Sequence, residues 1–259
     1  MKITCIQMNM QFCRPEENFL RVSELVEEAG RKQPDVILLP ETWNTGFFPG
    51  ENPEALADPE GQRTKALLSP LAKKHGVNIV AGSITELRQG SLYNTCHVFD
   101  REGNTVASYD KTHLFSPMGE NQVYTPGSGL CNFRLDGVSC GVIICYDLRF
   151  PEMTRKLCLA GVDVLFLPSQ WPAQRISQLH TLAAARAIEN QLFLACCNSC
   201  GIAGDIRYGG ASVILDPLGQ PVAQADAREQ LLTGSCDLAV LSQLRRQIPV
   251  FQNRREDLY

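Results

Sequence analysis

The chain has 259 residues, enough for one large α/β domain or two small ones with a core that requires neither metal nor disulfides. Its formal net charge is −4 and its arginines are scattered apart from short pairs, so no basic stripe indicates nucleic-acid binding. No run approaches the ~18 apolar residues that cross a bilayer, and the N-terminus has no secretory signal pattern. We therefore expect a soluble, cytoplasmic protein whose partner is a small molecule rather than a membrane or a nucleic acid.

The cysteines indicate a reduced protein. Their number, 11, is odd, so at least one cannot pair, and we expect most to be small buried residues. Cys197 and Cys200 have the CxxC spacing of a redox pair or half a zinc site, but no second pair accompanies them. The histidines have no metal-ligand spacing either, so we expect neither a metal nor a cofactor.

Apolar, β-rich runs alternate with helical patterns along the chain, which is typical of an α/β fold. Strands are predicted at 3–8, 36–39, 77–83, 96–99, 105–108, 138–144, 164–167, 192–196, 211–215 and 231–236. Helices are predicted from Pro15 to a stop at Gly30, and at 153–159 and 175–189. The turn at 100–104 joins two strands as a hairpin, so the sheets are mixed. We expect one domain over residues 1–259, built from two packed sheets.

Two strands have nearly the same sequence pattern. PDVILLPE ends on Glu41 and DVLFLPS ends on Ser169, and each run passes through four apolar residues into a proline that is expected to stop the strand. The similarity indicates either two half-domains of related design or chance. If the strands are equivalent, the second brings Ser169, Gln170 and Trp171 to the same edge as Glu41.

Three reactive side chains follow predicted strands. Glu41 follows VILLP, Lys111 follows TVASYD, and Cys145 follows GVII at a strand-to-helix turn. In open α/β sheets ligands bind beyond the carboxyl ends of strands, so these groups can meet at one edge. A carboxylate, an ammonium and a thiol together favour a site with a base, an electrostatic stabiliser and a nucleophile.

These segments also resemble a known family. LLPETWNTGFF, YDKTHLF and GVIICYDLRFPE are similar, in this order, to the three catalytic motifs of the carbon-nitrogen hydrolase, or nitrilase, superfamily, and the likeness extends through GENQVYTPG, LPSQWPAQR, AARAIENQ and NRREDLY. The resemblance implies an α/β fold of the nitrilase type, a four-layer α-β-β-α sandwich of two mixed sheets. It also implies a Glu-Lys-Cys catalytic triad at Glu41, Lys111 and Cys145, and a further glutamate of the site at Glu120.

Elementary chemistry gives each of these residues a role. A thiol is mostly protonated at pH 7, so Cys145 needs a base, and burial raises the pKa of a carboxyl such as that of Glu41 toward a useful range. The Lys111 ammonium would stabilise the oxyanion formed when the thiolate attacks an amide. Glu120 would help to keep Lys111 charged.

Several alternatives stay open. His113, two residues after Lys111, is a competing base for the thiol, although no local sequence signature of a Cys-His protease is present. The same family includes N-carbamoyl and nitrile hydrolases, and a non-catalytic binding protein on this fold is also possible. A thiol peroxidase would use Cys145 or the CxxC pair.

Three residues after strand ends are candidates for binding substrate: Tyr146, Arg149 and Trp171. Arg149 could hold a substrate carboxylate, or it could pair with Glu152. CYDLRFPE and SQWPAQR look more like small amidases of the omega-amidase type, which implies hydrolysis of the terminal amide of short 2-oxo acids such as 2-oxoglutaramate to the acid and ammonia.

The resemblance also implies a homodimer. Family members pair through outer helices and C-terminal tails, which correspond here to AARAIENQ and to residues 245–259. The apolar tail residues Ile248, Val250 and Phe251 would be buried by such contacts. The alternative is a tail that folds back on its own subunit.

Overall fold

The computed structural model describes residues 1–47 and 52–258. Phe48, which belongs to the first of the three motifs, and Tyr259, the last residue of the tail, lie outside the described residues. None of the described helices has the length and apolarity of a membrane-spanning segment.

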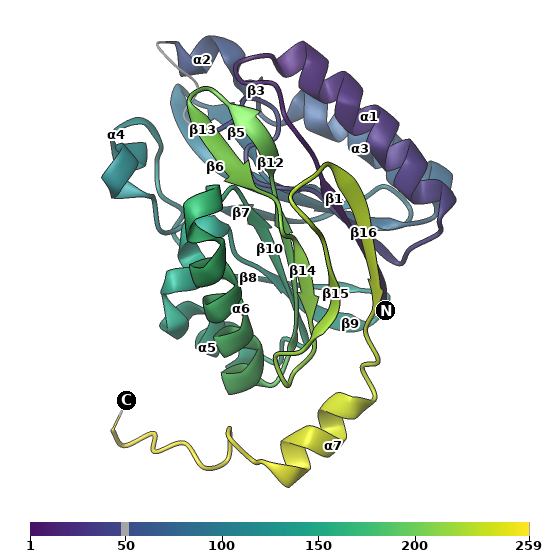
Figure 1. The fold of residues 1–259 in the computed structure, drawn as a ribbon, viewed down its shortest axis with the longest axis vertical. Coiled ribbons are helices and arrows are strands. Elements are labelled where there is room, and N and C mark those ends of the chain that lie inside the picture. Colours follow the sequence, from purple (N-terminus) through teal and green to yellow (C-terminus); the bar gives the residue numbers. More distant parts are fainter. Residues whose placement is uncertain (48–51, 259) are drawn as a thin grey trace.

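Four layers make up the body of the molecule (Figure 1). Helices α1 (Pro15–Arg31) and α3 (Gln62–His75) cover the outer face of the first sheet, and α5 (Pro151–Leu159) and α6 (Ile176–Asn190) cover the outer face of the second. This arrangement confirms the predicted α-β-β-α sandwich. The short helices and turns are α2 (Pro53–Leu56), α4 (Glu120–Val123), α7 (Val240–Gln247), η1 (Ser116–Met118), η2 (Cys145–Arg149) and η3 (Ala173–Arg175).

Both main sheets are mixed, as predicted. The first has the order β16 (Gln230–Ser235), β1 (Lys2–Gln7), β2 (Val36–Leu38), β4 (Asn78–Val80), β6 (Ser91–Phe99), β5 (Ile84–Arg88) and β3 (Asp58–Pro59), with β7 (Thr105–Asp110) paired to β6. The second has the order β15 (Pro221–Gln224), β14 (Val213–Leu215), β11 (Phe193–Asn198), β10 (Val164–Ser169), β9 (Val138–Val142) and β8 (Cys131–Leu135). A separate hairpin consists of β12 (Cys200–Ala203) and β13 (Ile206–Gly209).

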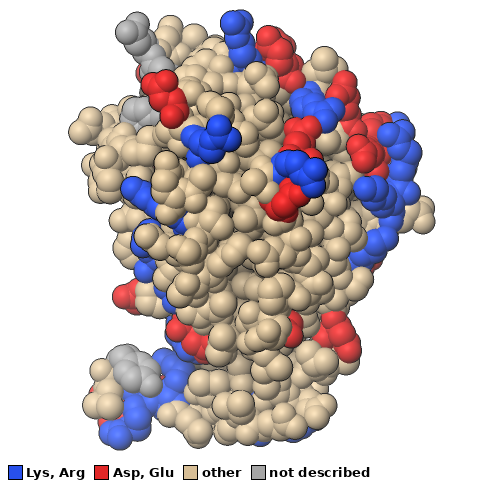
Figure 2. All heavy atoms as spheres, viewed as in Figure 1, with Lys and Arg blue, Asp and Glu red and all other residues tan. Residues whose placement is uncertain are grey.

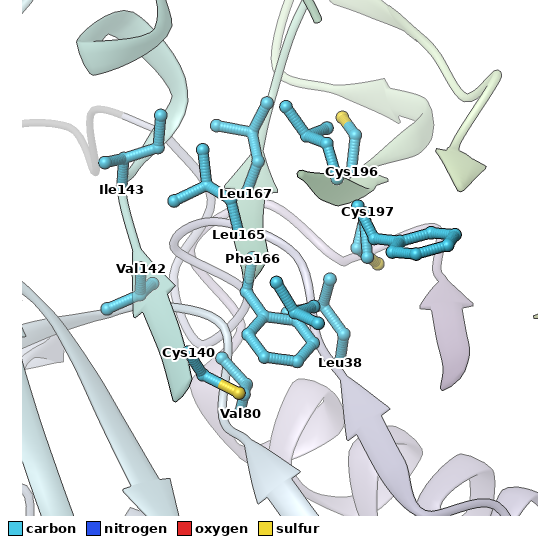
Figure 3. Close-up of a cluster of buried hydrophobic side chains, with 14 of the residues drawn as sticks. Leu38, Val80, Cys140, Val142, Ile143, Leu165, Phe166, Leu167, Cys196 and Cys197 are labelled. Atoms are coloured by element: carbon cyan, nitrogen blue, oxygen red, sulfur yellow. The ribbon is translucent and has the colours of Figure 1, made fainter. Parts of the chain in front are cut away.

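The apolar core follows the two-residue period of the strands. In β2, Val36 and Leu38 belong to the core that contains the facing sheet, whereas Ile37 belongs to the core under α1 and α3. Figure 3 shows Leu38 beside Phe166 of the other sheet, in the layer between the sheets. A strand covered on both faces must be apolar throughout, which is why the central strands could be predicted from sequence.

Several predicted boundaries differ from the observed ones, and two residues expected to stop an element, Gly30 and Pro168, do not end it. Helix α1 does not stop at Gly30 but continues one residue further, to Arg31. The glycine allows close packing instead, because a Cβ at Gly30 would lie 2.4 Å from the His75 ring.

Strand β10 does not stop at Pro168. The strand runs beside β11 as far as Ser169, but it pairs with β9 only as far as Phe166. The carbonyl of Phe166 accepts a hydrogen bond from the backbone N–H of Ile143 on the β9 side, and Pro168, two residues further on, faces the same side, so its missing N–H removes no bond of the sheet.

The tail after α7 contacts its own chain. Gln191 Nε2 donates to the carbonyl of Ile248 at 2.9 Å. The ring of Phe251 lies between the guanidinium groups of Arg155, at 5.5 Å, and Arg245, at 5.8 Å. In Figure 1 α7 and the tail extend beyond the lower end of the sandwich.

Candidate active site

Four ionisable residues meet beyond the strand ends, as the motifs predict. Glu41 follows β2, Lys111 follows β7, Glu120 begins α4 and Cys145 begins η2. Lys111 Nζ lies 2.8 Å from Glu41 Oε1 and 2.9 Å from Glu120 Oε2. The three charged side chains are completely buried. Segments far apart in sequence therefore form one compact charged cluster.

With two carboxylates, Glu41 and Glu120, around one ammonium, Lys111, the cluster has an excess of one negative charge. Burial raises the pKa of the Glu41 carboxyl; Lys111 opposes this and Glu120 adds to it. Burial lowers the pKa of Lys111, but the carboxylates of Glu41 and Glu120 outweigh burial and raise it above its ordinary value. Lys111 therefore stays protonated at neutral pH, while Glu41 is a stronger base than an exposed glutamate.

Cys145 lies on a sharp turn. Its backbone φ is +47°, a region that costs energy for any residue with a side chain, so the surrounding structure must hold it there. Burial raises the pKa of the Cys145 thiol, the Glu41 carboxylate adds to this, and Lys111 opposes it. The resting thiol is therefore protonated, and its ionisation requires transfer of the proton to a neighbouring base.

Asp147 fixes this turn from below. Its buried carboxylate accepts hydrogen bonds from the backbone of Ile144 at 2.9 Å, the backbone of His113 at 2.9 Å and the hydroxyl of Tyr109 at 2.7 Å. His113 Nδ1 lies 2.9 Å from the same carboxylate, and the ring stacks on Phe150 at 3.7 Å. His113 is thus engaged with Asp147 and is absent from the lining of the pocket that contains Cys145.

A pocket of about 270 Å³ opens beside Cys145. The three predicted substrate-binding residues, Tyr146, Arg149 and Trp171, all line it. The Arg149 guanidinium lies 4.9 Å from the Trp171 ring, and its Nη2 donates to Gln178 Oε1 at 2.8 Å. These two contacts of Arg149 are with uncharged side chains, and no ion pair with Glu152 or another carboxylate is found among the described residues, so its charge is available to a ligand.

The pocket also contains charged residues that the sequence patterns did not indicate. Arg175 of η3 and Arg207 of β13 line it, and among the described residues Asp205 is the one carboxylate in the lining. Arg175 belongs to SQWPAQR, next to Trp171, so its position in that loop was a usable signal. Arg207 had no comparable signal, because nothing in the sequence places the β12–β13 hairpin over the pocket.

The ends of the two similar strands meet at this site. The backbone N–H of Glu41 donates to the carbonyl of Ser169 at 3.4 Å, and Thr42 Oγ1 donates to Gln170 Oε1 at 3.2 Å. Gln170 and Trp171 line the pocket, as expected, but Ser169 lies outside the lining and its hydroxyl contacts the Cys196 thiol. All three residues therefore reach the edge at which Glu41 lies, and two of them form part of the pocket wall.

The CxxC pair lies in the core. Cys197 Sγ lies 3.2 Å from the carbonyl of Ile6 and Cys200 Sγ lies 4.0 Å from that of Gln7, both in β1. The described part of the chain has no group of three or more His, Cys, Asp or Glu residues suited to a metal ion. Neither thiol lines the pocket.

Comparison with known proteins identifies the family. The model of the carbon-nitrogen hydrolase family matches residues 2–246, almost the whole chain. The chain belongs to the carbon-nitrogen hydrolase family. This membership agrees with the sandwich fold and with the order of the three motifs.

Relatives refine this assignment. This carbon-nitrogen hydrolase is 40% identical to the 2-oxoglutaramate amidase of Bacillus subtilis, over 99% of this chain and 98% of the relative. It is 32% identical to the omega-amidase NIT2 of Xenopus tropicalis, over 94% of this chain and 91% of the relative. These similarities support the omega-amidase-like branch.

A solved structure adds a chemical observation. A mutant of the amidase from Nesterenkonia sp. AN1 has a TM-score of 0.87 and 25% identity, covering 100% of this chain and 95% of that chain. That mutant shows covalent addition of the acetamide moiety of fluoroacetamide at its active-site cysteine. With its family and relatives taken together, the present carbon-nitrogen hydrolase is an amidohydrolase.

Proposed function

We propose that this amidohydrolase releases ammonia from the terminal amide of short 2-oxo dicarboxylic acids, 2-oxoglutaramate being the representative substrate. The observation that carries the proposal is the position of Cys145 between a buried Glu-Lys-Glu cluster and a pocket lined by arginines that have no carboxylate partner within residues 1–47 and 52–258. Two relatives named for 2-oxoglutaramate amidase and omega-amidase activity support the same substrate class.

In the first half-reaction Cys145 is the nucleophile. Glu41 takes the thiol proton, the sulfur attacks the amide carbon, and the oxyanion is stabilised by the Lys111 ammonium. Proton transfer from Cys145 to Glu41 leaves the total charge of the buried cluster unchanged, so ionising the thiol there adds no further net charge to the dry site. The protonated Glu41 then gives its proton to the departing nitrogen, and ammonia leaves a thioester.

In the second half-reaction water replaces the thiolate. Glu41, again a carboxylate, takes a proton from water, which attacks the thioester carbonyl while Lys111 again stabilises the oxyanion. The thiolate leaves and recovers the proton from Glu41, so the carboxylic acid is released with every group restored. Glu120 contributes the second carboxylate that keeps Lys111 charged and fixed in place.

The charges of the pocket support an anionic amide as substrate. In the part of the chain that the structure describes, Arg149, Arg175 and Arg207 line it against one carboxylate, that of Asp205, in a protein whose net charge is −4. A guanidinium binds a carboxylate with two parallel hydrogen bonds, so each arginine can hold the acid end of the substrate while its amide reaches Cys145. The apolar ring of Trp171 and the ring of Tyr146 would enclose the short carbon chain.

A panel of small compounds tests this function. The protein is incubated separately with 2-oxoglutaramate, neutral amides, nitriles and N-carbamoyl compounds, and ammonia is measured for the wild type, for Cys145→Ala and for Cys13→Ala, a half-buried cysteine outside the pocket. We expect fastest release from 2-oxoglutaramate, loss of release in Cys145→Ala and normal release in Cys13→Ala. Unchanged release in Cys145→Ala would exclude the thiol mechanism, and faster release from a nitrile or N-carbamoyl compound would exclude the substrate class.

We further propose that two copies pair through the face over α6, β14 and β15. Few charged side chains lie on this face (Figure 2), and Ile188, Leu218 and Val222 are large apolar residues exposed on it. Sedimentation velocity tests the pairing: the wild type should sediment as a dimer and Ile188→Glu as a monomer, and a monomeric wild type would contradict it.

We also propose that the protein is located in the cytoplasm. Its eleven free thiols suit a reducing compartment.

A further inference from the structure

A neutral side chain closes the charged cluster into a ring. Asn94 of β6 donates from Nδ2 to Glu41 Oε1 at 3.0 Å and to Glu120 Oε1 at 3.1 Å. Both oxygens also accept from Lys111 Nζ, at 2.8 Å and 3.0 Å. In addition, the backbone carbonyl of Asn94 accepts a hydrogen bond from the backbone N–H of Lys111 at 2.9 Å. Asn94, itself buried, therefore contacts every charged member of the cluster.

The ring leaves the two oxygens of Glu41 in different states. Oε1 accepts two hydrogen bonds, one from a cation and one from an amide, so its lone pairs in the carboxylate plane are occupied. Oε2 is buried and has no partner at ordinary hydrogen-bond distance among the described residues, and the Cys145 thiol is close enough to affect the pKa of this carboxyl through a side-chain hydrogen bond. A proton arriving at this carboxylate therefore has one open oxygen to bind.

We propose that Asn94 is a positioning residue of the amidase reaction: it saturates Glu41 Oε1 and holds the carboxylate so that Oε2 exchanges the proton with Cys145. The inference rests on the proposed function, since it assumes that Glu41 is the base. Asn94 is not among the described residues that line the pocket, and its side chain donates to Glu41 and Glu120, so it acts through these two carboxylates.

An amide suits this place better than other buried side chains. Its two N–H groups match the two carboxylate oxygens, and it adds no charge to a cluster that already has an excess negative charge. An aspartate of the same shape would remove both donors and add a third carboxylate. An alanine would leave Glu41 Oε1 with Lys111 alone. Each change favours protonated Glu41, which cannot act as the base.

The pH dependence of kcat/KM separates positioning from a purely structural role. We would measure 2-oxoglutaramate hydrolysis from acid to neutral pH for the wild type, Asn94→Ala, Asn94→Asp and the control Asn190→Ala, which removes a buried asparagine at the end of α6. We expect the acid limb of Asn94→Ala to move upward by about one pH unit, because a shift of that size corresponds to the free energy of one hydrogen bond to a charged group. We expect a larger upward shift for Asn94→Asp, kcat lowered about tenfold or more, and no shift for Asn190→Ala.

The possible outcomes distinguish this inference from the proposed function. An active Asn94→Ala whose acid limb coincides with that of the wild type would overturn the positioning role. If Asn94→Ala does not fold, Asn94→Ser, which keeps one hydroxyl donor, is read in the same way, with a smaller upward shift expected. A wild type that releases no ammonia, or a Cys145→Ala variant that still does, would instead overturn the proposed function.

Discussion

Strands β2 and β10 have nearly the same sequence and the same setting, yet their ends carry different chemistry. Each is a fully buried, parallel strand in the middle of its sheet. Their ends meet through the backbone bond from Glu41 to Ser169. β2 delivers a carboxylate to a charged cluster, whereas β10 delivers the wall residues Gln170 and Trp171. The comparison teaches that the strand fixes where a residue lies, and the side chain together with its neighbours decides what it does.

The two ends also differ in what they require from the rest of the chain. A buried carboxylate is costly unless a counter-charge and hydrogen-bond donors surround it, so the end of β2 depends on Lys111 and Asn94. The residues after β10 are uncharged and need only packing and ordinary hydrogen bonds. Changes near β2 should therefore affect kcat and stability together, and changes near β10 should affect substrate binding.

The largest effect is expected for Lys111→Met, on the β2 side. Removing the ammonium takes away an oxyanion donor, for which we expect a loss of about 10²–10³ in kcat or more. It also leaves two buried carboxylates unpaired, so the free energy of unfolding should fall by about 3–5 kcal/mol. Kinetics and urea denaturation measure the two losses. Lys156→Met, an exposed lysine of α5, is the matched control and should change neither; equal effects in both variants would contradict the prediction.

In the pocket whose wall includes Gln170 and Trp171, the residues after β10, we expect a change in substrate binding. Arg149→Gln, Arg175→Gln and Arg207→Gln should each raise the KM for 2-oxoglutaramate about 10–100-fold, since each loses a charged hydrogen bond to the substrate carboxylate. Hydrolysis of neutral butyramide should change less than about threefold. Steady-state kinetics with both amides measures the ratio, and Arg21→Gln on α1 is the control. Equal losses on both amides would show that these arginines do not recognise the anion.

The acid limb of the wild-type pH profile of kcat/KM reports the protonation of Glu41, the residue at the end of β2. The active form of Glu41 is the carboxylate and its pKa is raised, so kcat/KM should fall about tenfold per pH unit as the pH decreases through a value above the ordinary ~4.3 of glutamate. Arg149→Gln should leave the position of this limb unchanged, because Arg149 lines the substrate pocket and is not part of the buried cluster around Glu41. A limb at or below ~4.3 would contradict a raised pKa.

The smallest effect is expected for Pro168→Ala, within β10 itself. The substitution adds a backbone N–H where the pairing with β9 has already ended, and it frees the unfolded chain. We expect the free energy of unfolding to fall by about 1 kcal/mol and kcat to be retained. Chemical denaturation and ammonia release measure both quantities. A higher free energy of unfolding in Pro168→Ala would contradict the prediction. It would show that a backbone N–H at this position is better for stability than the proline.

The central strands and Glu41 could be predicted from the sequence for one physical reason, whereas Lys111 follows a largely exposed strand and Glu120 was indicated only by the family resemblance. Strands buried on both faces are apolar throughout, and a charged residue directly after such a run, such as Glu41, stands out. Gly30 and Pro168 do not end their elements: the glycine makes a close contact with His75, and the proline faces the side of β10 on which the pairing with β9 has ended. No local sequence pattern contains either fact.

Asn94 and Arg207 could not be found in this way. Asn94 lies inside β6 and Arg207 inside β13, and a polar residue within a strand is usually only a solvent-facing position. Their roles depend on which segment lies opposite: α4 with Glu120 for Asn94, and the turn with Cys145 for Arg207. Long-range packing sets both, so only the three-dimensional structure reveals them.

The most direct test of the account compares the two strand ends in one experiment: kcat/KM for 2-oxoglutaramate in Glu41→Gln and in Ser169→Ala. A positioned general base contributes about 10²–10⁴, so Glu41→Gln should lose at least 10² while remaining folded. Ser169→Ala removes a hydroxyl that lies outside the pocket and should lose less than about tenfold. Comparable losses in the two variants, or near-normal activity in Glu41→Gln, would contradict the central claim that the end of β2 supplies the base.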